Sequence, residues 1–321
     1  MKAISMVAES SASDVARRIQ ENVAKVLRGK PEVIELAITA LLSKGHLLVE
    51  DVPGVGKTSL ARALATSIGV DFRRIQFTSD LMPTDVTGGS VYDTRSSEFE
   101  FRPGPVFTDV LLADEINRTT PKTQSALLEA MEERQVSIEG VTHRIPEPFF
   151  VIATQNPEDF HGTYPLPESQ LDRFMLCLEI GYPSAEVERD LIRSRRGGDP
   201  LSDIHEVVSK AELLQAQEAV NAVRVEGLLV DYVHDIVLAT RTSDLLSLGV
   251  SIRGALALER AARARAVVKG RDHVVPDDIK ELAVPILAHR VRLASRADSN
   301  VRRSDASRVM RDILQDVVVP I

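Results

Sequence analysis

The chain has 321 residues, of which 44% are hydrophobic and 27% are charged, a composition typical of a globular protein of about two domains. No apolar run approaches the ~18 residues of a membrane span, and the N-terminus lacks the pattern of a signal peptide. We therefore expect a cytoplasmic protein with no membrane span. The single cysteine, Cys177, lies in an apolar run and is predicted to be a buried strand thiol.

The net charge of −8 is unevenly distributed along the chain. Residues 1–190 hold 19 Lys and Arg against 29 Asp and Glu, a net charge of −10, whereas residues 191–321 hold 20 against 18, a net charge of +2. Proteins that bind nucleic acid over a broad surface carry an excess of positive charge there. The acidic first part therefore argues against general nucleic-acid binding, although these totals are compatible with a local basic pore.

The first part of the chain alternates between helical and strand patterns. Helical periodicity covers residues 12–27 and 31–43, and a helix opens at Thr120-Pro121. Apolar runs predict strands at residues 47–49, 72–77, 110–113, 149–154 and 174–180, and β-hairpins are predicted near 91–102 and 135–145. Strands that alternate with helices predict an α/β layer fold with a parallel sheet.

The loop after the first strand has the sequence of a phosphate-binding loop, Pro-Gly-Val-Gly-Lys-Thr. In such a loop the backbone N–H groups and the helix N-terminus converge on a phosphate, while Lys57 adds a positive charge and Thr58 a hydroxyl for Mg²⁺. The residues predicted to bind the nucleotide are Pro53, Gly54, Val55, Gly56, Lys57, Thr58 and Ser59. Asp51 stands where the usual pattern has its first glycine. Because Asp tolerates a positive φ, the turn can survive, and only nucleotide affinity is left open.

Two further strands are predicted to end in catalytic side chains. The run at 110–113 ends in Asp114, which can hold Mg²⁺ through water, and Glu115, which can polarise the attacking water. The run at 149–154 is followed by Asn156, which either orients that water or is a turn residue before Pro157.

From about residue 191 onward the pattern is helical throughout, which predicts a division into residues 1–190 and 191–321. A capping box of Ser209 and Glu212 precedes the first helix. The helices are predicted at 213–223, 228–241, 252–268, 277–290 and 305–318. Arg253 lies in a first helical turn, where cations are disfavoured, so it either binds a nucleotide phosphate or forms a surface ion pair.

Together these motifs resemble the MoxR family of AAA+ ATPases, in the helix-2-insert clade that includes magnesium chelatase ATPase subunits. The blocks that carry the resemblance are 50–58, 101–105, 113–118, 153–157, 171–174 and 251–255. The resemblance implies a P-loop NTPase αβα sandwich with a parallel sheet, followed by a smaller all-α lid domain. It also implies ATP and Mg²⁺ as cofactors. Its implied roles are Walker A for Lys57 and Thr58, Walker B for Asp114 and Glu115, sensor 1 for Asn156, arginine finger for Arg173 and sensor 2 for Arg253.

The resemblance further implies a hexameric homo-oligomeric ring that hydrolyses ATP to remodel or activate a protein client. A von Willebrand A domain protein is the implied partner. It is a separate chain, because the only Asp-x-Ser, Asp305-Ala306-Ser307, is not followed by a second serine at Val309. The alternatives are a nucleic-acid-associated motor and a slow, nucleotide-dependent scaffold.

Arg173 is predicted to act on the neighbouring subunit's ATP. It precedes the last strand of the sheet, whereas Lys57 and Asp114 belong to the carboxyl edge, so its own phosphate loop is hard to reach. The alternative is a structural arginine paired with Asp172 or a loop carboxylate. Whether Arg118 or Arg134 also acts across the subunit interface is left open by the sequence.

Overall fold

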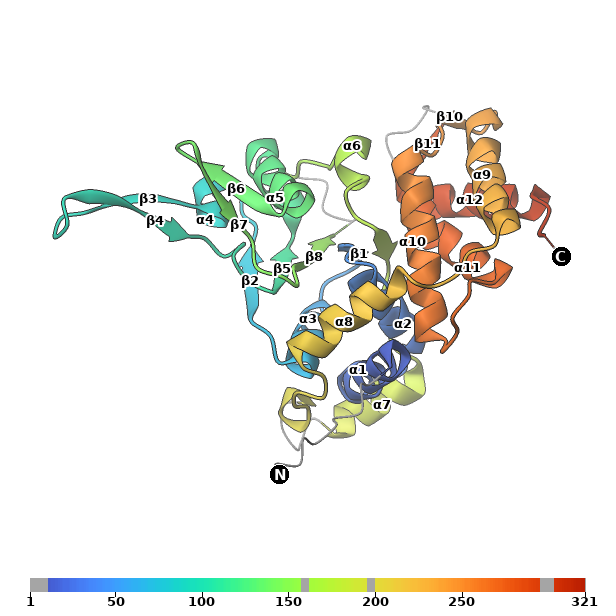
Figure 1. Cartoon of the computed structure of the whole chain (residues 1–321), viewed down its shortest axis with the longest axis horizontal. Helices are drawn as coiled ribbons and strands as arrows, with labels where there is room; N and C mark the ends of the chain where they lie inside the picture. Colours follow the sequence, from blue (N-terminus) through green and yellow to red (C-terminus); the bar gives the residue numbers. More distant parts are fainter. Residues whose placement is uncertain (1–10, 157–161, 195–199, 295–302, 321) are drawn as a thin grey trace, which may run out of the picture.

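A computed structural model of the chain describes residues 11–156, 162–194, 200–294 and 303–320. Five parallel strands form one sheet in the order β2-β5-β8-β1-β9. Figure 1 labels β2, β5, β8 and β1 among them. The five strands are β1 (Leu47–Glu50), β2 (Phe72–Gln76), β5 (Val110–Asp114), β8 (Phe150–Gln155) and β9 (Leu176–Leu178). They are the five strands that the apolar runs predict, so the predicted parallel sheet is confirmed.

The sheet is buried on both faces. Along each inner strand, alternate residues belong to two different hydrophobic clusters, because successive side chains of a strand point to opposite faces. In β1, for example, Leu47 and Val49 pack in one cluster and Leu48 in the other. This two-sided burial explains why the inner strands read as continuous apolar runs.

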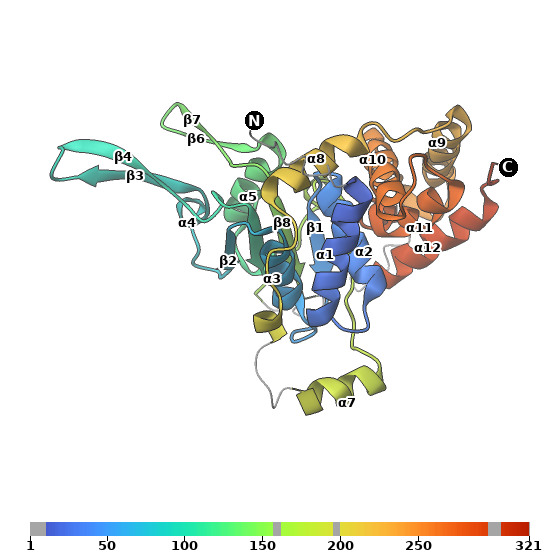
Figure 2. The same ribbon diagram turned by 60° about the horizontal axis from the view of Figure 1, so that its bottom comes forward.

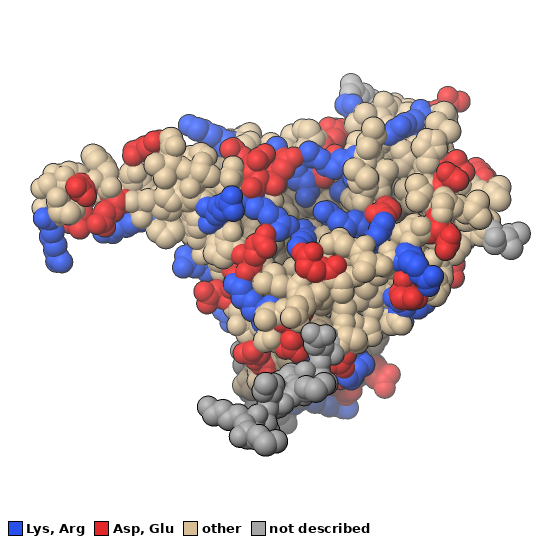
Figure 3. All heavy atoms as spheres, in the orientation of Figure 1, with Lys and Arg blue, Asp and Glu red and all other residues tan. Residues whose placement is uncertain are grey.

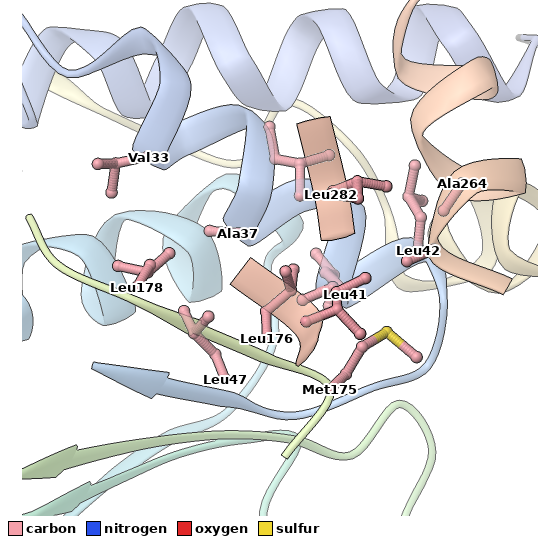
Figure 4. Packing of buried hydrophobic residues seen from close by; sticks show 14 of the residues in the cluster. Val33, Ala37, Leu41, Leu42, Leu47, Met175, Leu176, Leu178, Ala264 and Leu282 are labelled. Atoms are coloured by element: carbon pink, nitrogen blue, oxygen red, sulfur yellow. The ribbon is translucent and has the colours of Figure 1, made fainter. Parts of the chain in front are cut away.

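Helices cover both faces and complete the αβα sandwich. Buried residues of α1 (Ala12–Val26), α2 (Pro31–Leu42) and α3 (Lys57–Ile68) belong to the first cluster. Figure 4 shows Val33, Ala37 and Leu41 of α2 packed over β1 and β9. On the other face, α5 (Pro121–Glu133) contributes Leu127 and Leu128, and the short α4 (Pro83–Thr87) also belongs to this side.

Two β-hairpins project from the sheet on the side away from the C-terminal helices, as Figure 2 shows. The longer one pairs β3 (Gly88–Asp93) with β4 (Glu98–Pro103), and the shorter one pairs β6 (Gln135–Ile138) with β7 (Val141–Arg144). Both hairpins are predicted from the sequence, and the first is longer at its base than the predicted segments.

The C-terminal part is a bundle of helices that packs on α1 and α2. Its members are α8 (Lys210–Val220), α9 (Gly227–Thr242), α10 (Ile252–Val268), α11 (Pro276–Leu287) and α12 (Arg303–Asp316), with short turns η3 (Pro200–Asp203) and η4 (Ala288–Arg290). All five helices are predicted, and Ser209 and Glu212 form the expected capping box at α8. Buried residues of α8, α10 and α11 share one cluster with α1 and α2, so the two parts of the chain have a common core.

The prediction that this part is helical throughout is wrong in one place. β10 (Leu246–Leu248) and β11 (Arg292–Leu293) form a short antiparallel pair. Segments of two or three residues are too short to show a two-residue period, which is why the sequence pattern does not reveal them. The predicted division at residue 190 falls within a further helix, α7 (Ala185–Ser194), which the sequence analysis does not predict.

Two other predictions concern burial. Cys177 is a buried thiol on β9, as expected from its apolar surroundings. Among the described residues, no helix has both the length and the apolar character needed to cross a membrane.

Candidate active site

The phosphate loop connects β1 to α3 and places its backbone N–H groups at a helix N-terminus. Gly54 and Gly56 have φ values of +87° and +106°, so both positions favour glycine. At Gly56 a Cβ atom would also lie 3.1 Å from Leu27 Cδ1. α3 begins at Lys57, immediately after this loop, so its unpaired N–H groups face the same space.

Asp51 contributes to the loop through its side chain and not through its backbone conformation. It is not among the described residues that have a positive φ, so the reason given above for tolerating Asp there is wrong. Its Oδ2 accepts hydrogen bonds of 2.7 Å from the N–H groups of Ile180 and Gly181, and its Oδ1 accepts one of 2.8 Å from Val52. The carboxylate is buried and ties the start of the loop to the chain after β9.

A cleft of about 380 Å³ opens in front of the loop. It is lined by Pro53, Gly54, Gly56, Lys57, Thr58, Ser59, Arg74, Gln76, Asp114, Glu115 and Asn156. The residues predicted for the phosphate loop, Mg²⁺ and the attacking water all line this cleft except Val55, which lines an adjoining cavity. The Lys57 ammonium donates to the backbone carbonyl of Asp51. Burial lowers the pKa of Lys57, and the carboxylates of Asp51, Asp114 and Glu115 oppose that shift.

Asp114 is the last residue of β5 and Glu115 follows it, and the neighbouring strand β8 orients both. The hydroxyl of Thr154 donates to Asp114 Oδ1 at 2.6 Å and accepts from the Glu115 N–H at 2.9 Å. Glu115 has left-handed backbone angles, φ 58° and ψ 49°, which are uncommon for a residue with a Cβ atom. Such conformations concentrate at functional sites, where the surrounding structure holds them in place.

Strand β2 supplies a polar network that the sequence analysis does not predict. The Nη2 atom of Arg74 donates to Asp114 Oδ2 at 2.6 Å. The same nitrogen also donates to Gln76 Oε1 at 2.7 Å. Gln76 in turn donates to Glu115 Oε2 at 2.8 Å. Because β2 and β5 are adjacent parallel strands, their carboxyl ends meet at one edge of the sheet. The signal that could have found both residues is their position at the end of a predicted strand.

The residues present fit a magnesium ion bound together with a nucleotide. Thr58 and Asp114 line the same cleft, and Mg²⁺ in phosphate sites is held by one or two protein oxygens together with phosphate oxygens and water. Among the residues that the structure describes, no group of three or more His, Cys, Asp or Glu is arranged for a metal.

Asn156 follows the last residue of β8 and lines the cleft, as Glu115 does. The adjacent Pro157 lies outside the described residues. A side-chain amide at this edge can orient a water molecule near the phosphate loop.

The two remaining predicted arginines lie elsewhere. Arg173 and Arg253 line a different cavity, of about 630 Å³, between α5 and α10. Both pair with one carboxylate of α5, that of Glu132: Arg253 Nη2 lies 2.6 Å from its Oε1 and Arg173 Nε 3.2 Å from its Oε2. Arg173 does not pair with Asp172, whose carboxylate binds Arg290 Nε at 2.6 Å.

This second cavity is strongly basic. Its cationic lining residues are Lys44, Arg134, Arg173, Arg253, Arg260, Arg263 and Arg290, against the acids Glu132, Asp172 and Glu259. Figure 3 shows Lys and Arg side chains gathered over this region of the surface. Of the two other arginines considered above, Arg134 belongs to this cavity, whereas Arg118 forms a 3.2 Å ion pair with Glu115 of the same chain.

A third cavity, of about 380 Å³, adjoins the phosphate loop and shares Gly54, Gly56 and Ser59 with the first cleft. Its apolar walls come from the end of α1, the segment after β9 and α7, and include Val26, Leu27, Tyr182, Leu191 and Ile192. These residues are not predicted from the sequence, because nothing in their own pattern points to a ligand.

Comparison with known proteins agrees with this geometry. Residues 46–176 match the family model described as "ATPase family associated with various cellular activities (AAA)", and residues 238–313 match an AAA lid domain. The chain is 43% identical over 307 residues to "Chaperone MoxR1" of Mycobacterium tuberculosis, covering 93% of this chain and 80% of that protein.

Two further matches cover nearly the whole chain. The protein YeaC of Bacillus subtilis is 49% identical over 301 residues, which are 94% of this chain and 93% of YeaC. A crystal structure of a candidate ATPase from Cytophaga hutchinsonii superposes with a TM-score of 0.87 at 36% identity, over 97% of this chain and 96% of that one. With a phosphate loop, a carboxylate pair at the sheet edge and a helical lid in one chain, the protein belongs to the MoxR family of AAA+ ATPases and is an enzyme that hydrolyses ATP.

Proposed function

We propose that this ATPase works as a hexameric ring in which Arg173 and Arg253 of one subunit complete the ATP site of the next. The proposed ring uses Mg²⁺ and ATP to remodel or activate a protein client, together with a von Willebrand A domain partner on a separate chain. One observation carries the ring arrangement. The cavity that holds both arginines shares no lining residue with the cleft around Lys57.

The cavity between α5 and α10 has the charge expected for a site that receives phosphate. Glu132 balances one of the two positive charges of Arg173 and Arg253, so the group retains a net positive charge. Arginine side chains aimed at the charge that develops on a transferring phosphoryl group stabilise the transition state. Two arginines held by one carboxylate are therefore suited to exchange that carboxylate for a neighbour's nucleotide.

The surface beside Arg253 has the apolar character of a subunit contact. Ile252 and Leu256, on the same turns of α10, are 71% and 64% exposed. Large apolar side chains exposed next to charged ones are typical of protein interfaces. A second copy of the chain would cover them while its phosphate loop approaches Arg253.

Within the cleft, each side chain has a role that its position allows. Lys57 and the loop N–H groups bind the phosphates, and Thr58 and Asp114 hold the proposed magnesium ion. That ion would neutralise charge on the phosphate oxygens. Glu115 accepts a proton from, or polarises, the attacking water, and Asn156 orients it. The adjoining apolar cavity next to Val26 and Tyr182 is proposed to hold the nucleotide base.

The remaining parts of the proposal concern the whole protein. We propose that residues 1–190 form the ATPase core and residues 191–321 the lid. Chaperone-like remodelling is proposed because a relative that covers most of the chain is described as a chaperone. A nucleic-acid motor is the alternative, but the net charge of −10 in residues 1–190 gives it no support.

Dilution tests the ring arrangement. If the arginines act on the neighbouring subunit, the ATPase activity per subunit should fall as the protein is diluted below the concentration at which rings persist. Nucleotide binding by single subunits should persist, because Lys57 and the loop lie within one chain. Activity that stays constant at concentrations where sizing shows only monomers would contradict the proposal.

A further inference from the structure

The guanidinium of Arg74 contacts the carboxylate of Asp114, which the proposed magnesium ion would also use. Two of its nitrogens, Nε and Nη2, lie 3.1 and 2.6 Å from Asp114 Oδ2. The other oxygen of Asp114 accepts the Thr154 hydroxyl, so both oxygens of this carboxylate are engaged within the chain. Asp114 is 15% exposed and Arg74 46% exposed, and both side chains line the cleft around Lys57.

The pairing is specific to the geometry of β2. Arg74 and Gln76 point to the same side of the strand, because alternate residues share a face, and Gln76 lies opposite Asp114 in the sheet. Arg73 is next to Arg74 in sequence but belongs to the other face. It is exposed and is not among the residues that line the cleft. One arginine of the two is therefore directed at Asp114.

We propose that Arg74 holds Asp114 in the metal-free site and must be displaced when Mg²⁺ and nucleotide bind, so that it sets the magnesium concentration needed for binding. The inference rests on the magnesium site proposed above. A carboxylate has about four acceptor sites on its two oxygens, and Arg74 takes two of them on Oδ2 through Nε and Nη2. A metal-bound water that needs Oδ2 therefore competes with the guanidinium for Asp114. Arg74 is here a positioning residue and not a catalytic one.

The displacement has a second consequence. Arg74 also donates to Gln76, and Gln76 donates to Glu115. When Arg74 leaves Asp114, Gln76 loses its own partner and the contact that holds Glu115 changes. Metal binding and the position of the water-activating carboxylate are thereby coupled through β2.

Nucleotide binding with and without magnesium tests this inference. The probe is a fluorescent, non-hydrolysable ATP analogue, titrated into the full chain in EDTA and at increasing Mg²⁺. In Arg74→Ala, Asp114 is free for the metal, so the half-saturating Mg²⁺ concentration should fall roughly threefold to tenfold. In EDTA the same variant should bind the analogue more weakly than the wild type, because the charge of Asp114 is no longer balanced near the phosphates.

Two variants are the controls. Arg73→Ala removes the same charge from the same strand and should change neither quantity. Arg74→Lys keeps the charge but not the two-nitrogen contact, so it should lie between the wild type and Arg74→Ala. Arg74→Ala should bind the analogue more weakly in EDTA but need less Mg²⁺ for half-saturation. Structural damage would instead weaken binding under both conditions, so the two causes can be told apart.

The outcomes are distinguishable. An unchanged or higher magnesium requirement in Arg74→Ala, or an equal shift in Arg73→Ala, overturns the role of Arg74 while leaving the proposed magnesium site intact. A wild-type chain whose nucleotide affinity does not respond to Mg²⁺ overturns the magnesium site itself, and this inference with it.

Discussion

Replacing Asp51 by alanine tests whether this side chain holds the phosphate loop in place. The carboxylate is 8% exposed and accepts three backbone N–H groups, from Val52, Ile180 and Gly181. Leaving a buried donor unsatisfied costs about 1–3 kcal/mol. Two of the three donors are only partly buried, so we expect Asp51→Ala to lower the free energy of unfolding by about 2–4 kcal/mol. At roughly 2–4 °C per kcal/mol, the melting temperature should fall by roughly 5–15 °C.

Thermal unfolding of three variants separates the side-chain contacts from the backbone. Asp51→Asn keeps the shape and one acceptor oxygen, so its loss should be smaller than that of alanine. Asp51→Gly restores the first glycine of the usual loop pattern but none of the contacts, so it should be at least as unstable as Asp51→Ala. A glycine variant as stable as the wild type would refute the reasoning, because the loop would then need only backbone freedom at this position.

Three further predictions follow from the site and from burial. Glu115→Gln should bind ATP in a filter or fluorescence assay yet hydrolyse it at least ~10²-fold more slowly; normal turnover would exclude Glu115 as the residue that activates water. Burial lowers the pKa of His46 to about 4 in the folded chain, against 6.5 when unfolded, so stability should fall as the pH drops through 6.5 and level off below 4. The full loss of unfolding free energy is about 3 kcal/mol, and most of it should appear between pH 7 and pH 4.5 when the wild type is unfolded with urea. His46→Gln should lose less over the same pH range. An equal loss in that variant would assign the effect to other groups. Single-stranded DNA at physiological salt should leave the ATPase rate unchanged, and stimulation of several-fold would favour the nucleic-acid motor.

The sheet and its helices could be predicted because their physical cause is local. Each inner strand is an apolar run, each lid helix has an apolar face, and α8, α10 and α11 begin with a capping serine or a proline. Thr120 shows the limit of such rules: it is the N-cap of α5, but its side chain makes no capping hydrogen bond. Strand order is set by contacts far apart in the sequence, and no local pattern encodes it.

The parts of the site that the sequence does not reveal are those that depend on neighbouring strands. Arg74 and Gln76 gain their significance only because β2 lies beside β5. In the sequence alone, Asp51 is only a departure from the phosphate-loop motif. Its role follows from the hydrogen bonds that it accepts from the chain after β9. Arg173 and Arg253 are 80 positions apart in the printed sequence, and Glu132 brings them together from a third element. Side chains on different elements meet through packing, which local patterns do not describe.

Mixed rings test the central claim that Arg173 serves the neighbouring subunit's ATP. Arg173→Ala subunits keep a working phosphate loop, and Lys57→Ala subunits keep a working arginine, so each preparation alone should be nearly inactive. An arginine aimed at developing phosphoryl charge is worth about 10³–10⁵ in rate, so even a few restored sites are measurable. In rings shown by sizing to contain both variants, the account predicts ATPase activity above the sum of the two separate preparations. Activity no greater than that sum would contradict it.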